Sequence, residues 1–267
     1  MNLVYNSDVL SAAGWSVPAT DRAFQYGDGL FETIRYEAGH LWFWPDHYDR
    51  LTQGMAALHL DVPNGLEPGT LRQTALDLIH RNGLSEGPAR LKLQVWRQSG
   101  GLYTPTTNAA NWLLTAQSAQ PFRLTEKPNV GVFADVRLSP SPVSRFKTLN
   151  ALPYVLAGLY KQQRGYDEVL LLDQRGYVAE CVASSLFWQT GGRWFAPSLD
   201  TGCIDGILRR QFLRTWPVTE GLFHPADVLS ADVVFCANVM GVQALLGTSA
   251  TAVETELKKG SLAGFTR

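Results

Sequence analysis

The sequence predicts an α+β protein with two domains: an N-terminal α/β two-layer domain over residues 1–119 and a C-terminal, β-barrel-like domain with helices over residues 127–267. Two observations carry this prediction. Helical and strand-like patterns are segregated in the first half of the chain, whereas the second half is a dense succession of strand-like segments with helices among them. A polar, proline-bearing stretch, residues 120–126, lies between the halves and is typical of an interdomain linker.

Two helices and two strands are expected in the first half. One helix begins at Pro45, since proline suits a first helical turn, and its apolar residues recur at helical spacing. A second helix begins at about Thr70 and stops at Gly83. Apolar and other residues alternate over 90–97 (RLKLQVWR), which predicts a half-buried strand. Residues 111–117 are its expected partner strand.

Strands dominate the expected elements of the second half. One strand is expected over residues 130–136, and a loop then leads to Lys147. The helix that follows is expected to turn four apolar residues inward: Leu152, Val155, Leu156 and Leu159. Further strands are expected in EVLLLD, YVAECV, SLFWQT, RWFAP, VTEGLF and DVVFCAN, and a helix in GILRRQFLRTW. This order predicts a strand-rich barrel or sandwich that carries helices.

The bulk composition is that of an ordinary globular protein, with 45% hydrophobic and 18% charged residues among 267. The formal net charge of −1 provides no global field that would favour nucleic acid or an anionic membrane. No apolar run is long enough to span a bilayer, and the N-terminus lacks the pattern of a signal peptide. Three cysteines, Cys181, Cys203 and Cys236, form no paired motif and fit a reducing compartment. We therefore expect a cytoplasmic protein that binds neither nucleic acid nor membrane.

Familiar catalytic motifs are missing from the sequence. The five histidines have no zinc-binding spacing, so no metal site is expected. There is also no phosphate loop and no nucleophile elbow.

Two ionisable residues stand out instead. Lys147 leads into an apolar helix, and lysine is rarely buried without a reason. A desolvated lysine there could act as an amine nucleophile toward an aldehyde cofactor, and a helix-start lysine that faces solvent is the alternative. Glu180 lies in the apolar segment YVAECV, where a buried carboxylate is costly unless a cation pairs with it. A solvent-facing glutamate is the alternative at this position.

Five blocks, in order along nearly the whole chain, carry a resemblance to a known family. They are DRAFQYGDGLFETIR (residues 21–35), HYDRL ending at Leu51, FKTLNALPYVLA, DEVLLLDQRGYVAECVASSLFW (residues 167–188) and APSLDTGCIDGILRR. With these blocks the chain resembles the fold-type IV pyridoxal-5′-phosphate enzymes, which are class IV aminotransferases and related lyases. The resemblance implies a fold-type IV architecture, with pyridoxal 5′-phosphate as the cofactor.

The same resemblance implies a role for individual residues. Lys147 would hold the cofactor as a Schiff base and then shuttle a proton, Glu180 would face the pyridine nitrogen, and Arg50 would bind the phosphate. Leu208 stands where many relatives carry threonine, so backbone N–H groups at the helix start would have to hold the phosphate there. The other cofactor-binding positions that the resemblance implies are Ser184, Ser185, Ile207, Asn238, Val239 and Met240.

The resemblance leaves the reaction open. RQSGGLY (residues 97–103), CANVMGV and the run from AECV to LFW are similar to 4-amino-4-deoxychorismate lyase, which forms 4-aminobenzoate and pyruvate for folate biosynthesis. The opening block occurs equally in D-amino-acid and branched-chain transaminases, so a transaminase is the alternative. A cofactor-free scaffold protein is a third possibility, which the joint retention of Lys147, Glu180 and Arg50 disfavours.

Either reaction requires a small amino substrate that bears a carboxylate. Arginine recognises carboxylates in a bidentate manner, so Arg35 and Arg97 are candidate substrate-binding residues, with Tyr26 and Tyr103 near them. The resemblance also implies a homodimer, in which the opening block of one subunit closes the site of its partner.

Overall fold

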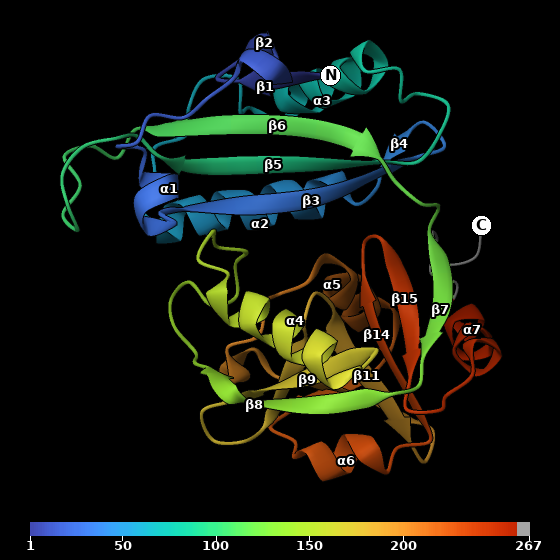
Figure 1. The fold of residues 1–267 in the computed structure, drawn as a ribbon. Coiled ribbons are helices and arrows are strands. Elements are labelled where there is room, and N and C mark those ends of the chain that lie inside the picture. Colours follow the sequence, from blue (N-terminus) through green and yellow to red (C-terminus); the bar gives the residue numbers. More distant parts are fainter. Residues whose placement is uncertain (261–267) are drawn as a thin grey trace. The chain divides into compact units, whose positions relative to one another are not determined.

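The computed structural model describes residues 1–260, which form two compact units (Figure 1). The first unit comprises Met1–Pro121 and the short segment Phe146–Asn150. The second comprises Phe122–Arg145 and, of the described residues, 151–260. The segment that contains Lys147 therefore belongs to the first unit, although its neighbours in sequence belong to the second.

The first unit is built on a six-stranded sheet with the order β2-β1-β6-β5-β3-β4, in which all neighbours are antiparallel. Its strands are β1 (Asn2–Tyr5), β2 (Asp8–Ser11), β3 (Gly29–Glu37), β4 (His40–Leu41), β5 (Ala89–Arg97) and β6 (Ala110–Ser118). The two strands expected in this half are confirmed as β5 and β6, which pair with each other. The opening block supplies β3, the other neighbour of β5.

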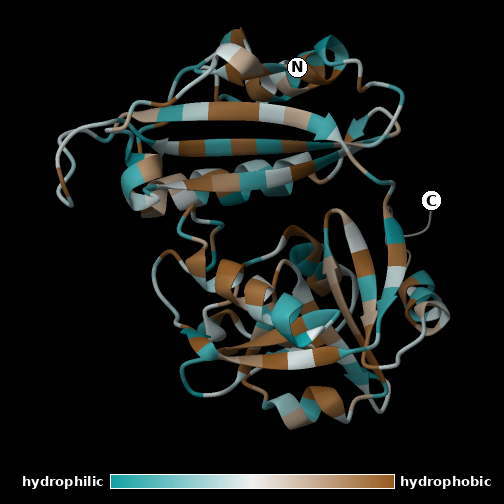
Figure 2. Cartoon of the chain, viewed as in Figure 1, coloured by the Kyte–Doolittle hydropathy of each residue, from teal (hydrophilic) through white to brown (hydrophobic). Residues whose placement is uncertain are grey.

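Alternation along β5 divides this sheet into two unlike faces, and the alternating hydropathy of the strands is visible in Figure 2. Leu91, Leu93 and Val95 are buried, whereas Lys92 and Gln94 between them are partly exposed. Successive residues of a strand point to opposite faces, so the strand presents an apolar and a polar side. Burial of each large apolar side chain stabilises the fold by roughly 1.5–3 kcal/mol.

The helices of the first unit are α1 (Arg22–Tyr26), α2 (Trp44–Ala57) and α3 (Pro68–Arg81), with a short 3-10 turn η1 (Ala12–Gly14). Both helices expected in this half are confirmed, with proline in the first turn of each. The buried stripe of α3 is Leu71, Ala75, Leu78 and Ile79. The helix ends before Gly83, which has a left-handed φ of 66°.

The second unit contains two open sheets. One has the order β10-β9-β8 and the other β13-β12-β11-β14-β15-β7. Their strands are β7 (Arg123–Lys127), β8 (Val130–Leu138), β9 (Glu168–Asp173), β10 (Val178–Cys181), β11 (Ser185–Thr190), β12 (Arg193–Pro197), β13 (Val218–Gly221), β14 (Val233–Asn238) and β15 (Gly241–Leu245). Residues 1–260 contain no closed barrel, so the barrel-like expectation is corrected. The strand run divides because β8 and β9 pair in parallel across the helix that joins them.

The helices of the second unit are α4 (Leu152–Arg164), α5 (Ile207–Thr215), α6 (Pro225–Leu229) and α7 (Ala250–Lys259), with a 3-10 turn η2 (Leu199–Thr201). None of the helices in the described part of the chain has the length and hydropathy required to cross a membrane.

The prediction that α4 turns its leucines and valine inward is wrong. Leu152, Val155, Leu156 and Leu159 are 61%, 55%, 38% and 47% exposed. The helix instead buries Ala157, with Tyr154 and Tyr160 packed against the cluster around Phe133. Apolar spacing identifies a common face of a helix, but it does not determine which neighbour covers that face.

The expected linker also differs from the structure. Residues Arg123–Lys127 form β7, which pairs in parallel with β15 at the edge of the larger sheet of the second unit. Polar, charged residues are typical of an edge strand, since they discourage further pairing there. Because this strand is held by backbone pairing, its sequence has no apolar pattern from which the strand could be predicted.

Candidate active site

The backbone of Lys147 is fixed beside β3 in the first unit. The N–H of Phe31 donates to the carbonyl of Lys147 over 2.8 Å, and the N–H of Leu149 donates to the carbonyl of Gly29 over 2.9 Å. The Lys147 side chain is half-buried, and its Nζ lies 4.7 Å from the centroid of the Phe31 ring. Lys147 therefore sits in an extended segment before α4 rather than at the start of the helix itself.

A second lysine approaches the same aromatic ring. Nζ of Lys92, on β5, lies 5.2 Å from the centroid of Phe31. Burial lowers the pKa of Lys92, and the nearby Arg90 lowers it further. No sequence motif identified Lys92, although the alternation of residues 90–97 places it on the polar face of the strand. Two amines thus gather around Phe31 within the first unit.

Arg50 belongs to a buried ionic cluster on α2. Its Nε and Nη2 donate to the two carboxylate oxygens of Glu32 over 2.7 and 2.6 Å, and His47 Nδ1 lies 2.6 Å from Glu32. All three side chains are at most 4% exposed. Burial would raise the pKa of Glu32, but the Arg50 guanidinium and the His47 hydrogen bond outweigh it and lower the pKa to about 2. Glu32 and His47 were not identified from the sequence, because their partners are close only in the fold.

Gly54 connects this helix with the Lys147 segment. A Cβ at Gly54 would lie 2.8 Å from Leu30 Cδ1 and 3.2 Å from Phe146 Cγ. A side chain at this position would therefore require Leu30 and Phe146 to shift, and glycine allows α2 to pack against them without that shift. The contact lies one helical turn from Arg50 and one residue from Lys147.

Glu32→Gln tests the ionic cluster. We expect the substitution to lower the free energy of unfolding at neutral pH by about 3–5 kcal/mol, since it leaves the buried Arg50 without its carboxylate. The folded-state pKa of Glu32 lies below its unfolded value, so its stabilisation is complete above about pH 4.5 and is lost as the pH falls toward about 2. Burial lowers the pKa of His47. The unfolded state therefore binds a proton at this residue more readily, and further stability is lost as the pH falls below the usual pKa of histidine.

Urea unfolding at neutral pH and at about pH 3 measures both effects. The parent should lose roughly 2 kcal/mol more than Glu32→Gln over this interval, because the folded-state pKa of about 2 keeps part of the stabilisation at pH 3. The exposed Glu86→Gln should behave like the parent at both pH values. Equal acid sensitivity of Glu32→Gln and the parent would contradict the assignment.

Glu180 is a buried carboxylate of the second unit, with 4% exposure on β10. Its Oε1 accepts a hydrogen bond from the hydroxyl of Tyr154 over 2.7 Å and from the N–H of Ile204 over 3.2 Å. The pairing register of β10 with β9 shifts between Val178 and Glu180. The solvent-facing alternative is therefore wrong for Glu180, and Tyr154 is a neighbour that sequence reasoning missed.

The start of α5 is suited to an anion. Its N-cap is Gly206, with no side-chain hydrogen bond to the first turn, so the opening N–H groups are not capped from within the helix. Ser185 Oγ lies so close to Gly206 that a Cβ on Gly206 would clash with it. Ile207 and Leu208 are 3% and 2% exposed, so Leu208 packs in the core and offers no polar side chain there.

Asn238 organises the turn between β14 and β15. Its Nδ2 donates to Ser184 Oγ and to the carbonyl of Ala183, each over 3.0 Å. Its Oδ1 accepts the N–H of Met240 over 2.8 Å, and Val239 between them is 7% exposed. The structure thus joins Asn238 and Met240 to Ser184, the neighbour of Ser185 beside the start of α5.

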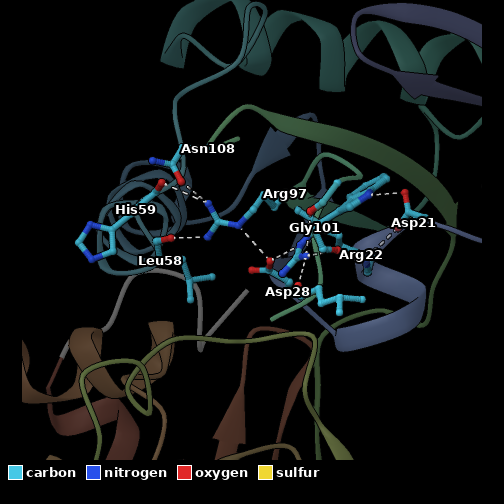
Figure 3. Close-up of polar contacts among 12 residues, drawn as sticks. Asp21, Arg22, Asp28, Leu58, His59, Arg97, Gly101 and Asn108 are labelled. Carbon is cyan, nitrogen blue, oxygen red and sulfur yellow. Dashed lines mark hydrogen bonds and ion pairs between the residues drawn. The ribbon is translucent and has the colours of Figure 1, made fainter. Parts of the chain in front are cut away.

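Arg97 lies in a polar network of the first unit (Figure 3). It donates to Asp28 over 3.0 Å, to Asn108 Oδ1 over 2.7 Å and to the carbonyl of Leu58 over 2.6 Å. Asp28 also accepts from Arg22 Nε over 2.8 Å, and Arg22 donates to the carbonyl of Leu102 over 2.6 Å. Arg97 therefore links Asp28 and the end of α2 with Asn108 of the loop between β5 and β6, and Arg22 holds the same loop at Leu102.

The other three proposed substrate-binding residues have different surroundings. Arg35 is 1% exposed, and its guanidinium stacks 4.5 Å from the ring of Trp42. Burial lowers the pKa of Arg35 to about 10. The rings of Tyr26 and Tyr103 are 5.7 Å apart, and Tyr103 is 90% exposed at the tip of the loop. Of the four proposed substrate-binding residues, Tyr26 and Tyr103 are therefore the pair that the structure brings into contact.

Asp28→Asn tests the network around Arg97. We expect it to lower the free energy of unfolding by about 3–5 kcal/mol, because Arg22 and Arg97 would lose a shared carboxylate in a mostly buried site. Urea unfolding measures the loss, and faster proteolysis in the loop near Leu102 should accompany it. Asp8→Asn, on the exposed strand β2, is the matched control and should retain parental stability. A parental unfolding midpoint for Asp28→Asn would show that the network contributes little.

Within residues 1–260, no group of three or more His, Cys, Asp or Glu side chains is arranged to hold a metal ion. The chemistry-bearing side chains described above are instead amines, guanidinium groups and carboxylates.

Comparison with known proteins identifies the family. The model of the family described as amino-transferase class IV matches residues 29–245. An aminodeoxychorismate lyase of Vibrio harveyi is 27% identical over 257 residues, which are 92% of each chain. A D-alanine aminotransferase of Listeria monocytogenes is 28% identical over 254 residues, covering 89% of this chain and 84% of the relative.

The fold is similar to that of solved aminotransferase structures. A branched-chain amino acid aminotransferase of Escherichia coli superposes with a TM-score of 0.86 at 20% identity, covering 100% of this chain and 95% of the other. The expected fold-type IV architecture is therefore confirmed. Since the family match spans most of the sequence, the chain belongs to the class IV aminotransferases, a family of pyridoxal-phosphate-dependent enzymes.

Proposed function

We propose that this enzyme binds pyridoxal 5′-phosphate at Lys147 and acts as a 4-amino-4-deoxychorismate lyase, forming 4-aminobenzoate and pyruvate. The observation that carries the reaction is the similarity to an aminodeoxychorismate lyase over 92% of both chains. The RQSGGLY segment, which resembles that lyase, supports the same choice.

The described residues fit the cofactor. Glu180 is a buried carboxylate that accepts hydrogen bonds from the neutral Tyr154 hydroxyl and from a backbone N–H, and a carboxylate in this setting suits a protonated ring nitrogen. The uncapped start of α5, with Ser185 against Gly206, suits a phosphate. Lys147 offers a half-buried amine on a backbone fixed by β3. We propose Lys147, Glu180, the start of α5 and Arg50 as the cofactor-binding groups of this chain.

Each residue then has a separate task. When bound, pyridoxal phosphate supplies an electron sink for the bonds next to the substrate nitrogen. Lys147 holds the cofactor and moves the proton, Glu180 keeps the ring nitrogen protonated, and Arg50 grips the phosphate through charge-assisted hydrogen bonds. Ser184, Ser185, Asn238, Val239 and Met240 shape the remaining wall of the phosphate site.

In the lyase reaction, Lys147 Nζ removes the ring proton of the substrate. The bond to the enolpyruvyl oxygen then breaks, the ring becomes aromatic, and enolpyruvate takes up a proton to give pyruvate. Arg35, Tyr26 and Tyr103 remain proposed substrate-binding residues. Arg97 would contribute through the network that it forms with Asp28 and Asn108, and Lys92 adds a cation beside Phe31.

An amino-acid transaminase is the second candidate. It is favoured by the D-alanine aminotransferase relative, which is as similar in sequence as the lyase. In that reaction the same Lys147 amine would carry a proton from the substrate Cα to the cofactor.

A substrate panel separates the two candidates. The purified, cofactor-loaded enzyme is given 4-amino-4-deoxychorismate, and in parallel D-alanine or L-leucine with 2-oxoglutarate. We expect 4-aminobenzoate and pyruvate in equal amounts from the first substrate. Rapid keto-acid formation from D-alanine or L-leucine, without 4-aminobenzoate from the first, would overturn the lyase proposal in favour of the transaminase.

We also propose that the enzyme is a homodimer. The exposed apolar face of α4, formed by Leu152, Val155, Leu156 and Leu159, offers contiguous apolar surface of the kind that protein interfaces cover. Light scattering at micromolar concentration should give twice the chain mass of 29.5 kDa. A fully active monomer would contradict the proposal.

A further inference from the structure

The hydrogen bond between Tyr154 and Glu180 links two elements of the second unit. Tyr154 lies on α4, and its hydroxyl donates over 2.7 Å to Oε1 of Glu180 on β10. The N–H of Ile204 reaches the same oxygen over 3.2 Å. Because Glu180 is 4% exposed, water does not replace these donors easily.

The proton of this hydrogen bond stays on the phenol. Burial and the adjacent Glu180 carboxylate raise the pKa of Tyr154 far above its usual range. The same two causes raise the pKa of the Cys203 thiol, on the segment before α5, to about 12. The Tyr154 phenol and the Cys203 thiol are therefore both neutral at physiological pH. Tyr154 therefore acts as the donor in its hydrogen bond with Glu180.

We propose that Tyr154 is a positioning residue that keeps Glu180 ionised and oriented, so that the cofactor's ring nitrogen rather than Glu180 carries their shared proton. This inference rests on the proposed function, in which Glu180 faces that nitrogen. A donor to a carboxylate stabilises its charged form and lowers its affinity for a proton. The nitrogen competes with Glu180 for one proton, so each donor to Glu180 favours the protonated ring.

The size of the effect follows from the type of hydrogen bond. Hydrogen bonds to charged groups change equilibria by about ten- to a hundredfold when they are removed. Loss of the Tyr154 hydroxyl should therefore shift the ratio of nitrogen-bound to oxygen-bound proton by about that factor. A merely structural tyrosine would leave this ratio unchanged.

The test uses holoenzyme loaded with pyridoxal phosphate that carries ¹⁵N in its ring. The parent should show the chemical shift of a protonated ring nitrogen at neutral pH. Tyr154→Phe should bind the cofactor and move the resonance toward the unprotonated value. Tyr160→Phe is the matched control on the same helix, since its ring packs 5.2 Å from Phe133, and it should retain the parental shift.

The outcomes distinguish a failure of the proposed function from a failure of the role proposed for Tyr154. If the parent binds no cofactor, the proposed function fails. If the parent binds cofactor and Tyr154→Phe keeps the parental ¹⁵N shift, only the role of Tyr154 is overturned.

A variant of closer shape covers the case in which Tyr154→Phe does not fold. Replacement of Tyr154 with 4-aminophenylalanine keeps a weaker donor at the same place, so its resonance should lie between the protonated and unprotonated values. A parental shift in that variant would overturn the inference in the same way.

Discussion

Replacing Lys147 with alanine is expected to abolish turnover and covalent cofactor binding while the fold survives. The backbone of this residue is held by hydrogen bonds from Phe31 and from Leu149 to β3, which alanine retains. Nothing else in its segment offers an amine at this position, so the covalent attachment and the proton transfer are lost together.

Turnover of Lys147→Ala measures the loss of activity, and circular dichroism measures whether the fold survives. Lys161→Ala, on the far end of α4, is the matched control and should keep parental activity. Activity of Lys147→Ala within about tenfold of the parent would mean that another group performs the proton transfer, since that factor corresponds to only ~1.4 kcal/mol of the barrier.

Glu180→Gln is expected to retain the cofactor and to slow the reaction by about two decades, equivalent to roughly 2.7 kcal/mol of transition-state stabilisation. The amide keeps an oxygen that Tyr154 and Ile204 can donate to, so the local packing should persist. It carries no charge, however, and no longer favours a protonated ring nitrogen. Both candidate reactions need that protonated ring, so the expectation holds for the lyase and the transaminase alike.

Single-turnover rates at saturating cofactor measure this effect apart from binding. The exposed Glu254→Gln on α7 should react at the parental rate. A rate for Glu180→Gln within about threefold of the parent, below ~1 kcal/mol, would show that Glu180 does not act on the ring nitrogen.

Strong periodicity made most elements predictable from the sequence. The alternation of RLKLQVWR and the apolar stripe of α3 correspond closely to β5 and α3, because burial on one face leaves a direct pattern. Strand β7 was missed because a charged edge strand is held by backbone pairing alone. The face of α4 was misassigned because apolar spacing does not specify the partner that covers it.

The site was only partly predictable for a related reason. Lys147, Glu180 and Arg50 were identified because their blocks match a family in order along the chain. Their neighbours were not. Glu32 reaches Arg50 across 18 positions, and Tyr154 reaches Glu180 across 26. Such pairs depend on tertiary contacts, which a single sequence does not display. Arg97, by contrast, lies in a segment that resembles the lyase, and it was proposed as a substrate-binding residue. In the structure it donates hydrogen bonds to Asp28 and Asn108 of its own unit.

The central claim, that Lys147 carries the cofactor, is tested most directly by reduction and peptide mapping. Borohydride treatment of the cofactor-loaded enzyme should fix a phosphopyridoxyl group on the lysine amine. Trypsin would then fail to cleave after Lys147, so the modified group should appear on the single peptide FKTLNALPYVLAGLYK, from Phe146 to Lys161. Modification of a different lysine, such as Lys92, or cleavage after Lys147 with no modified peptide, would contradict the account.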